Sequence, residues 1–336
     1  MSPKRKTDII ILSDLITEPI TFVDVGARGG VIELRNIAKY VKAIGVEPNP
    51  LEKELILSGH YEKDKRGYWA KPKYLQLNYY WGAITKSSSS IDLFITSHPG
   101  ASGIKTPNYE NLDFKYKLNM TSKEIKNSFN ESFVIKKTIN VPSISIDQLM
   151  SDFDITHIDY LKIDVEGNEY EVLESVSEIS KKVSLIRVEV CFLQFRNSQK
   201  LFDDVFKLLI NAGFSFITFR DIQKGYKSKL NSNYWNERYG FKNIEATWMS
   251  ADAYFVRYPE VKELRYKLSL ILCSKGFMDQ ALICIKDDVE TYENILKTQD
   301  KHLIIWIIPL LLDILNKFKF TIVLKKLIKK LLGKGN

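Results

Sequence analysis

Residues 21–30, TFVDVGARGG, constrain the fold of this chain more than any other segment. The apolar, β-branched and aromatic residues at its start are typical of a buried strand. An acid, Asp24, lies near the end of that strand, and Gly26, Gly29 and Gly30 follow it. Glycines let the backbone turn tightly and approach a ligand closely. The segment therefore predicts the first strand and ligand loop of a nucleotide-binding α/β domain.

A second acid follows the next predicted strand. A helical pattern over residues 33–41 leads into the apolar run 43–46 and then Glu47, which lies 23 residues after Asp24. In dinucleotide-type folds an acid about 20 residues beyond the glycine loop holds a ribose diol. The loop is not a full GxGxxG, and it lacks the Lys-Ser/Thr pair of a Walker phosphate loop. A glycine turn that binds nothing is the alternative interpretation.

The string DYLKIDVEGNEY, residues 159–170, predicts a central strand with a charged face. Lys162 and Asp164 share one side of it, because side chains alternate along a strand. Such residues are costly to bury unless they are paired or functional. Lys162 is expected to pair with Asp164 or with Glu189. Asp164 and Glu166 lie at the carboxyl end of the strand, where open α/β sheets bind ligands.

The helix after this turn has a capping pattern, since Asn168 and Glu171 fit an N-x-x-E capping box, which gives them a structural role. On the later predicted strand 183–190, Arg187 and Glu189 share a face and are expected to pair with each other. The remaining pattern predicts strands over 74–85, 91–96, 133–141, 214–219 and 251–257, and helices over 8–16, 145–150 and 201–212. Residues 97–132 and 221–250 are read either as substrate-facing segments or as solvated loops.

Composition limits the class of protein. The 336 residues, 45% of them hydrophobic, suffice for a large globular core. Three separated cysteines in apolar surroundings and no export signal predict a cytoplasmic protein. Four scattered histidines give no metal signature. Most of the net charge of +8 lies beyond residue 256, so the rest of the chain does not have the basic surface of a nucleic-acid-binding protein.

The C-terminal region, residues 259–336, is predicted to be helical and to form a hairpin followed by a basic amphipathic helix over 314–336. The apolar run between them is too short for the roughly 20 residues of a membrane span. The last helix either docks on an anionic membrane surface or caps the fold with solvated lysines.

Four strings make the chain resemble the FkbM-type S-adenosylmethionine-dependent methyltransferases: FVDVGARGG, IGVEPNP, VPSISIDQL and IDYLKIDVEGNEYEVLES. The resemblance covers about residues 20–257. It implies a class I methyltransferase fold over 20–258, with a Rossmann-like seven-stranded sheet whose last strand is antiparallel. A lead-in helix over 1–19 and the helical C-terminal appendage flank this domain. It also implies methyl transfer to an oxygen, usually a hydroxyl of a sugar or polyketide-like product.

The resemblance further implies roles for single residues. It places Asp24, Gly26 and Gly30 around the methionine part of the cofactor, Glu47 on its ribose and Ala83 near its adenine. It places Asp164 and Glu166 so that they face the methyl-transfer centre. Ser102, in the turn PGASG, matches a serine that the family often has there. Arg28 stands where the family usually has Asn. It either pairs with the cofactor's carboxylate or points outward.

Catalysis by such an enzyme needs in-line positioning of an acceptor oxygen and removal of its proton. Asp164 is the first candidate for the base and Glu166 the second, followed by Glu189 and His98. The alternative for Asp164 is to orient the cofactor's ammonium group.

The sequence thus predicts an O-methyltransferase acting on a saccharide or glycoconjugate, in polysaccharide or natural-product modification. Its C-terminal helices are expected to serve membrane docking, at the inner face of the membrane, or homodimer contacts. Two alternatives stay open: a non-catalytic membrane-docking or assembly protein with a degenerate cofactor fold, and an NAD-dependent dehydrogenase, which the missing GxGxxG disfavours.

Overall fold

The structure is a computed structural model that describes residues 3–59, 71–87, 89–111, 132–178, 180–224 and 248–297. Its main sheet consists of β1 (Ile20–Val25), β2 (Val41–Val46), β3 (Gln76–Tyr80), β7 (Ile158–Ile163), β8 (Val183–Cys191), β9 (Ser215–Lys224) and β10 (Trp248–Val256). The strand order is β3-β2-β1-β7-β8-β10-β9, and β10 is antiparallel to both of its neighbours. The predicted seven-stranded sheet with an antiparallel last strand is confirmed.

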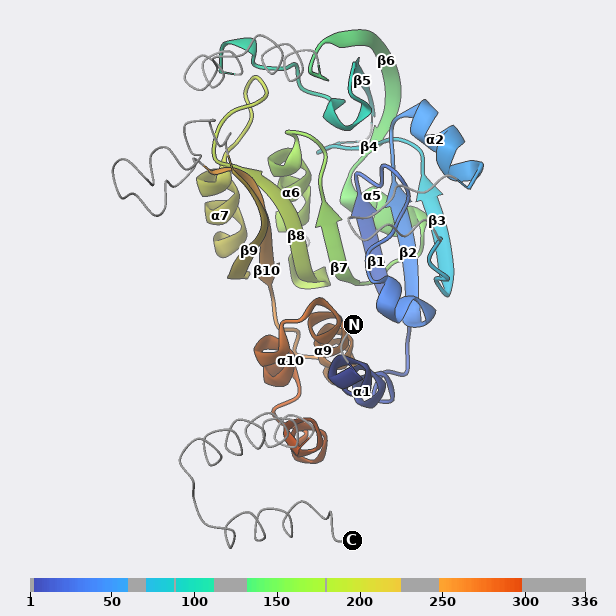
Figure 1. The fold of residues 1–336 in the computed structure, drawn as a ribbon, viewed down its shortest axis with the longest axis vertical. Helices are drawn as coiled ribbons and strands as arrows, with labels where there is room; N and C mark the ends of the chain where they lie inside the picture. The colour runs from blue at the N-terminus through green and yellow to red at the C-terminus, as the bar shows by residue number, and fades with distance from the viewer. Residues whose placement is uncertain are drawn as a thin grey trace, which may run out of the picture.

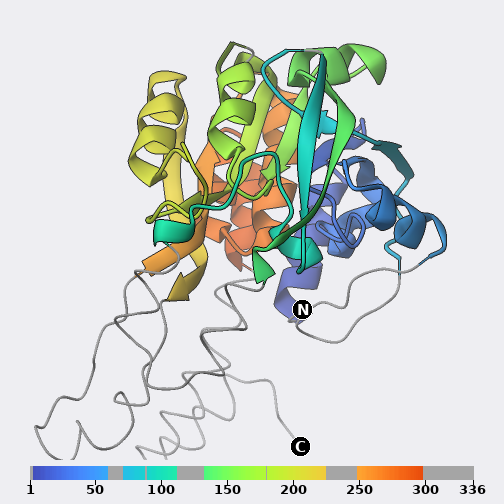
Figure 2. The ribbon, with the colours of Figure 1, turned by 90° about the horizontal axis from the view of Figure 1, so that it is seen from above.

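A second, three-stranded sheet was not predicted. It contains β4 (Ala83–Ile84), β5 (Ser89–Thr96) and β6 (Ile135–Ile144), in the order β4-β6-β5. In Figure 1 it lies above the carboxyl ends of the parallel strands, and Figure 2 shows β5 and β6 crossing that edge of the main sheet. The segment 74–85, predicted to be a strand and the start of the next loop, is therefore divided between two sheets. The break falls at Gly82, where a Cβ would lie 2.6 Å from the carbonyl oxygen of Pro142.

The described helices are α1 (Pro3–Ser13), α2 (Pro50–Leu57), α5 (Ile146–Asp152), α6 (Glu169–Glu178), α7 (Phe202–Asn211), α9 (Lys262–Lys275) and α10 (Met278–Cys284). Short 3-10 turns cover Arg35–Tyr40, Pro99–Ala101 and Ser180–Lys182. The first of these replaces the helix predicted over 33–41, because Leu34 before it and Ile37 within it depart from helical geometry.

One face of the main sheet packs on α5, α6 and α7. Along each strand the residues of that face alternate with those of the opposite face, as the period of a strand requires. The buried residues on it include Val23, Leu161, Ile186 and Phe255, and they form one cluster with apolar residues of the three helices.

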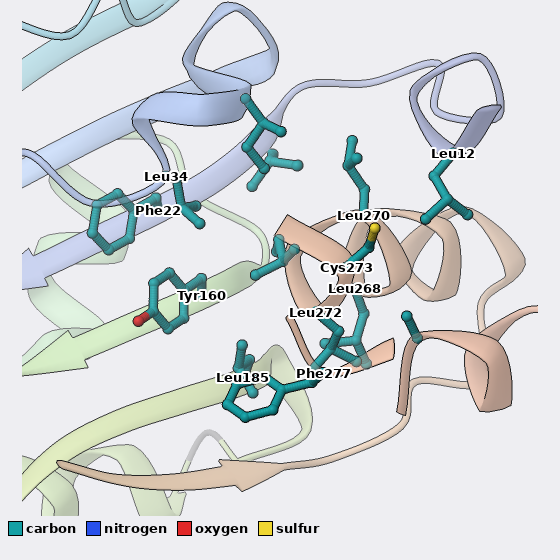
Figure 3. Close-up of a cluster of buried hydrophobic side chains, with 14 of the residues drawn as sticks. Leu12, Phe22, Leu34, Tyr160, Leu185, Leu268, Leu270, Leu272, Cys273 and Phe277 are labelled. Carbon is teal, nitrogen blue, oxygen red and sulfur yellow. The ribbon is translucent and has the colours of Figure 1, made fainter. Parts of the chain in front are cut away.

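The opposite face packs on α1, α9 and α10, which come from the two ends of the chain. Figure 3 shows Leu12 of α1 and Leu268, Leu270 and Leu272 of α9 beside residues from the first half of the parallel strands. In Figure 1 these helices lie at the lower end of the sheet. The C-terminal helices therefore complete the core of the sheet, a role that the sequence did not predict.

Among the described residues, no helix is both long and apolar enough to cross a bilayer. The predicted amphipathic helix over 314–336 and most of the loop 221–250 lie outside the described residues, so the structure does not test those two predictions.

Since α9 is part of the core, Leu272→Ala should lower the free energy of unfolding by about 2–5 kcal/mol, the usual result of emptying a fully buried leucine site. Val289→Ala, at a side chain that is 63% exposed, is the control and should cost less than about 1 kcal/mol. Urea titration of both variants measures the difference. Equal midpoints would contradict the packing of α9.

Candidate functional site

A cavity of about 460 Å³ lies at the carboxyl ends of β1, β2 and β7. We call it the central cavity. The small sheet and the turn at 99–104 close it from above. Its lining includes Asp24, Gly26, Arg28, Gly30, Glu33, Glu47, Glu52, Ala83, Ser102, Gly103, Lys162, Asp164, Glu166, Asn168 and Arg187.

A row of charged side chains crosses four adjacent strands, and its members on β1, β7 and β8 form the floor of the central cavity. Asp24, Lys162 and Arg187 are register neighbours on β1, β7 and β8, and Asp252 of β10 bonds to Arg187 at 2.5 Å. Asp24, Lys162 and Arg187 each lie two residues after an apolar or aromatic residue on the same face of the strand, and Asp252 lies two residues before Tyr254. We refer to Asp24, Lys162, Arg187 and Asp252 as the charged row.

Lys162 joins the ends of two strands. Its Nζ lies 3.0 Å from Asp24 Oδ1, 3.2 Å from the carbonyl oxygen of Gly26 and 3.6 Å from Asp164 Oδ2. Burial alone would lower the pKa of Lys162, but the carboxylates of Asp24 and Asp164 outweigh burial and raise it. Lys162 is therefore a fixed cation. The predicted pairing with Asp164 is found, whereas Asp24 was not foreseen as its closest partner.

Glu33 neutralises the other cation of the row. Its carboxylate pairs with Arg187 and with Lys275 at the end of α9, and it accepts a hydrogen bond of 2.9 Å from the hydroxyl of Tyr160. Burial favours its protonated form, yet Lys275 and Arg187 hold the pKa of Glu33 well below its usual range. The predicted Arg187–Glu189 pair is wrong, because Arg187 bonds to Glu33 and Asp252 instead.

Gly26 makes the closest backbone approach in the site. Its φ is +88°, and a Cβ there would lie 1.8 Å from the carbonyl oxygen of Asp164. The amides of Gly26 and Ala27 both donate to the carbonyl oxygen of Val46, which holds the loop against β2. The glycine is thus required by contact between β1 and β7, whether or not a ligand is bound.

Glu47 projects into the central cavity from the end of β2. It is 5% exposed, and its Oε1 accepts a hydrogen bond of 2.8 Å from the amide of Asn49. Burial raises the pKa of Glu47 to about 7, against that hydrogen bond. Its position agrees with the predicted role on a ribose diol.

Arg28 spans the mouth of the cavity. Its Nε lies 3.5 Å from Glu52 Oε1, and Glu52 Oε2 accepts a 3.4 Å hydrogen bond from the amide of Gly29. The side chain of Arg28 is about a third exposed and lines the cavity. The glycine loop is therefore tied to α2 through Glu52.

Three acids gather on the far side of the cavity. The carboxylate oxygens of Asp164, Glu166 and Glu189 lie within 4.8 Å of one another. Burial raises the pKa of Glu166 to about 8, with the charge of Asp164 adding to it and Arg196 opposing it. Burial, followed by Asp164 and Glu166, also raises the pKa of Glu189 well above its ordinary value. We call these residues the acid cluster.

The predicted site residues largely converge. Those that line the cavity are Asp24, Gly26, Arg28, Gly30, Glu47, Ala83, Ser102, Asp164 and Glu166. Glu189 reaches the acid cluster from β8, whereas His98 does not line the cavity. The carbonyl oxygen of His98 accepts from the hydroxyl of Thr96 and the amide of Ala101, and its amide donates to the carbonyl oxygen of Ser132. Ser102 Oγ accepts from the amide of Thr96 at 3.1 Å.

The predicted capping box of α6 is not found. Glu171 instead pairs with Lys105 at 2.6 Å, and the amides of Val165 and Gly167 donate to Glu169. Glu33 and Arg187 also line the cavity, and Lys275 pairs with Glu33; the sequence predicted none of these three positions. Nothing local signals them, since their partners come from distant segments.

The donor set of the central cavity suits a cationic cofactor. Six carboxylates line it (Asp24, Glu33, Glu47, Glu52, Asp164 and Glu166) against three cationic side chains (Arg28, Lys162 and Arg187), so the lining carries an excess of acid. S-adenosylmethionine carries a sulfonium and an ammonium group against one carboxylate. Apolar residues such as Ala83 and Ile84 complete the wall beside Glu47, as a nucleoside requires.

The strand order, the single antiparallel strand and the acidic cavity at the carboxyl ends of β1, β2 and β7 define a class I methyltransferase. The chain belongs to the methyltransferase FkbM domain family, whose model matches residues 24–216. S-adenosylmethionine, the cofactor that the resemblance implied, is therefore the methyl donor of this protein.

Solved structures similar to this chain are methyltransferases of distant sequence. A magnesium protoporphyrin IX methyltransferase from Synechocystis with bound SAM is 10% identical, with 75% of this chain and 79% of that chain covered and a TM-score of 0.31. A SAM-dependent methyltransferase from Methanosarcina mazei is 8% identical, with 77% and 99% covered and a TM-score of 0.32. No curated protein matches the sequence. The family assignment rests on the sequence match and not on these similarities.

Gly26→Ala should destabilise the protein by at least about 2 kcal/mol more than Gly59→Ala. Both glycines have a positive φ, +88° and +84°, but no described atom lies within 4 Å of a Cβ at Gly59. The comparison isolates the contact between Gly26 and Asp164. Thermal or urea unfolding of the two variants measures it, and equal losses would contradict the close approach.

Binding of S-adenosylhomocysteine should strengthen about tenfold between pH 6 and pH 8. Below its pKa of about 7, Glu47 is protonated and loses an acceptor for the ribose hydroxyls; above it, the carboxylate accepts from both. Isothermal titration across this range measures the effect. Glu47→Gln is the control, and a pH dependence that survives in it would assign the effect to another group.

Proposed function

We propose that the protein transfers a methyl group from S-adenosylmethionine to a hydroxyl of a saccharide or glycoconjugate. The observation that supports oxygen as the acceptor is the acid cluster, which offers a base of raised pKa beside the cofactor cavity. A hydroxyl must lose a proton as it is methylated, whereas the cofactor supplies an already electrophilic methyl group when bound. A polyol acceptor also suits the polar side chains of Arg28, Ser102 and Asn168 in the lining of the cavity.

Cofactor binding is divided between two sides of the central cavity. Glu47 would accept hydrogen bonds from the ribose hydroxyls of the cofactor, and Ala83 lies on the apolar wall of the cavity. Asp24, held by Lys162, and the amides of the glycine loop surround the methionine end. Arg28 at the mouth is placed to pair with the cofactor's carboxylate, while Asp164 carries the charge that attracts its ammonium group.

Glu166 is the better candidate for the base, ahead of Asp164. Asp164 already interacts with Lys162, which keeps its negative charge close to the cofactor end of the cavity. Glu166 lines the cavity and has a pKa of about 8, near the pH at which a general base works best. Glu189, which has no place in the lining, is positioned to take part by sharing a proton with Glu166.

Cellular context is part of the same proposal. A glycoconjugate acceptor suits a cytoplasmic enzyme that acts in polysaccharide modification, with residues 314–336 binding an anionic membrane surface or a second copy of the chain. Because the chain belongs to a methyltransferase family, the dehydrogenase alternative is discarded. If the protein were instead a non-catalytic docking protein, it would show no saturable binding of S-adenosylhomocysteine.

Glu166→Gln should lower the rate of methyl transfer by about 10²–10⁴-fold, the usual contribution of a general base, while S-adenosylhomocysteine still binds. The assay follows labelled methyl incorporation across a panel of oligosaccharides, with and without EDTA to separate direct proton transfer from a requirement for a divalent cation. Asp164→Asn should mainly weaken cofactor binding.

Two outcomes would contradict the proposal. One is a Glu166→Gln variant with unchanged turnover at every pH. The other is saturable cofactor binding with methylation of amines or thiols and of no saccharide.

A further inference from the structure

Arg196 is the largest fully buried side chain among the described residues, and it lies outside the lining of the central cavity. Its side chain is 1% exposed, and its Nη2 donates to the carbonyl oxygen of Ala101 at 2.5 Å and to Glu166 Oε2 at 3.2 Å. The guanidinium lies 4.9 Å from the centre of the Phe133 ring. Burying an arginine this completely requires compensation. A carboxylate and a carbonyl oxygen pair with Nη2, whereas the buried Nη1 has no hydrogen-bond partner among the described residues.

The segment that carries Arg196 is fixed on both sides. Gln199 Oε1 accepts from the amides of Phe195 and Arg196, at 2.8 and 3.2 Å. A Cβ on Gly167 would lie 2.6 Å from Arg196 Cγ, so the stem of the arginine fills the space that this glycine leaves. Pro107 forms an isolated bridge with Arg196 and ties the segment to residues of the 99–111 region.

Glu166 lies between several ionisable groups, and acids dominate them. Asp164 and Glu169 come from its own turn, and Glu189 and Cys191 come from β8. Lys162 lies on the neighbouring strand end but pairs with Asp24 and Asp164. Segment 99–104 has no ionisable side chain and faces Glu166 with main-chain atoms, Gly103 being the closest. Among the described residues, Arg196 is the cation that pairs with Glu166.

The backbone at Glu166 is unusual for a residue with a side chain. Its φ is +59°, in the left-handed region, and Gly167 after it has a φ of +107°. The carboxylate of Glu169 holds this turn by accepting from the amides of Val165 and Gly167. Strained positions of this kind persist where the surroundings fix them, and they concentrate at functional sites. Glu169 fixes the backbone of the turn, and Arg196 fixes the side chain.

We propose that Arg196 is a positioning residue that aims the Glu166 carboxylate at the acceptor and keeps it able to accept a proton. The proposal rests on the proposed function, in which Glu166 is the base. Through Ala101, the same guanidinium links Glu166 to the turn that carries Ser102, so the base and the upper wall of the cavity are held by one side chain. A purely structural arginine would hold that wall without changing the pH dependence of methyl transfer.

The test is an NMR titration of the protein labelled with ¹³C in the side-chain carboxyls of glutamate, with Glu166 assigned by its loss in Glu166→Gln. Arg196→Met should raise the pKa of Glu166 by about one to three pH units, the effect of removing an adjacent opposite charge. Arg257→Met is the matched control. It removes an arginine at the opposite end of the strands, where the guanidinium donates to the carbonyl oxygen of Ala212 at 2.7 Å. It should leave the titration unchanged.

A second measurement needs no change at Arg196. In the unmodified protein the ¹⁵N resonances of its guanidinium should shift with pH at the midpoint of Glu166, and this shift should vanish in Glu166→Gln. A folded Arg196→Met variant with an unchanged Glu166 titration would overturn the proposal. Guanidinium ¹⁵N resonances that do not shift with pH would overturn it as well. Neither measurement uses an acceptor, so failure of the saccharide proposal leaves both results interpretable.

With an acceptor in hand, the two roles predict different kinetics. If Arg196 acts through Glu166, Arg196→Met loses kcat at neutral pH and recovers it as pH rises through the new pKa. If Arg196 serves only the wall, kcat falls by the same factor at every pH, and the proposal is wrong.

Discussion

Neutralisation of buried charge on one face of the main sheet determines how the site is built. The charged row places Asp24, Lys162, Arg187 and Asp252 where neighbouring positions on the same strands are apolar. Such groups are tolerated only when opposite charges meet in good geometry. Glu33 and Lys275 complete the set, so the row is balanced by residues from four strands, a loop and a C-terminal helix. The floor of the cavity is thereby fixed by the same contacts that hold the strands in register.

Above this balanced floor lies an excess of acids that opposite charges only partly neutralise. Asp164, Glu166 and Glu189 crowd together, with Arg196 as the cation that pairs with Glu166. The two arrangements have different chemical consequences. Paired charges in the floor give the cavity its shape, whereas burial beside other acids raises the pKa of Glu166 to about 8. The charged row thus gives the cavity its shape, and the acid cluster serves the proposed proton transfer.

Local pattern was enough to predict most strands, the glycine loop and the acids Asp24, Glu47, Asp164 and Glu166, because each is encoded within a few residues. Partners were harder to predict. Arg187 was paired with Glu189 by strand alternation, but its side chain pairs with Asp252 of the neighbouring strand β10 and with Glu33 of a distant segment. Arg196 carries no local signal, since Ala101 and Glu166 lie far away in sequence. The role of α9 was missed because its amphipathic pattern does not say which surface it covers.

The distribution of the core along the chain has a consequence for synthesis. The match to the family ends at residue 216, yet β10 must still insert between β8 and β9, and α9 must still cover Phe22 and Tyr160. A chain emerging from the ribosome therefore carries a bare apolar sheet face, and an uncompensated Glu33, until residues beyond 275 have left the exit tunnel. The apolar face of its first strands stays uncovered until its last helices have been synthesised. During that interval the nascent protein depends on cellular factors that shield exposed apolar surface.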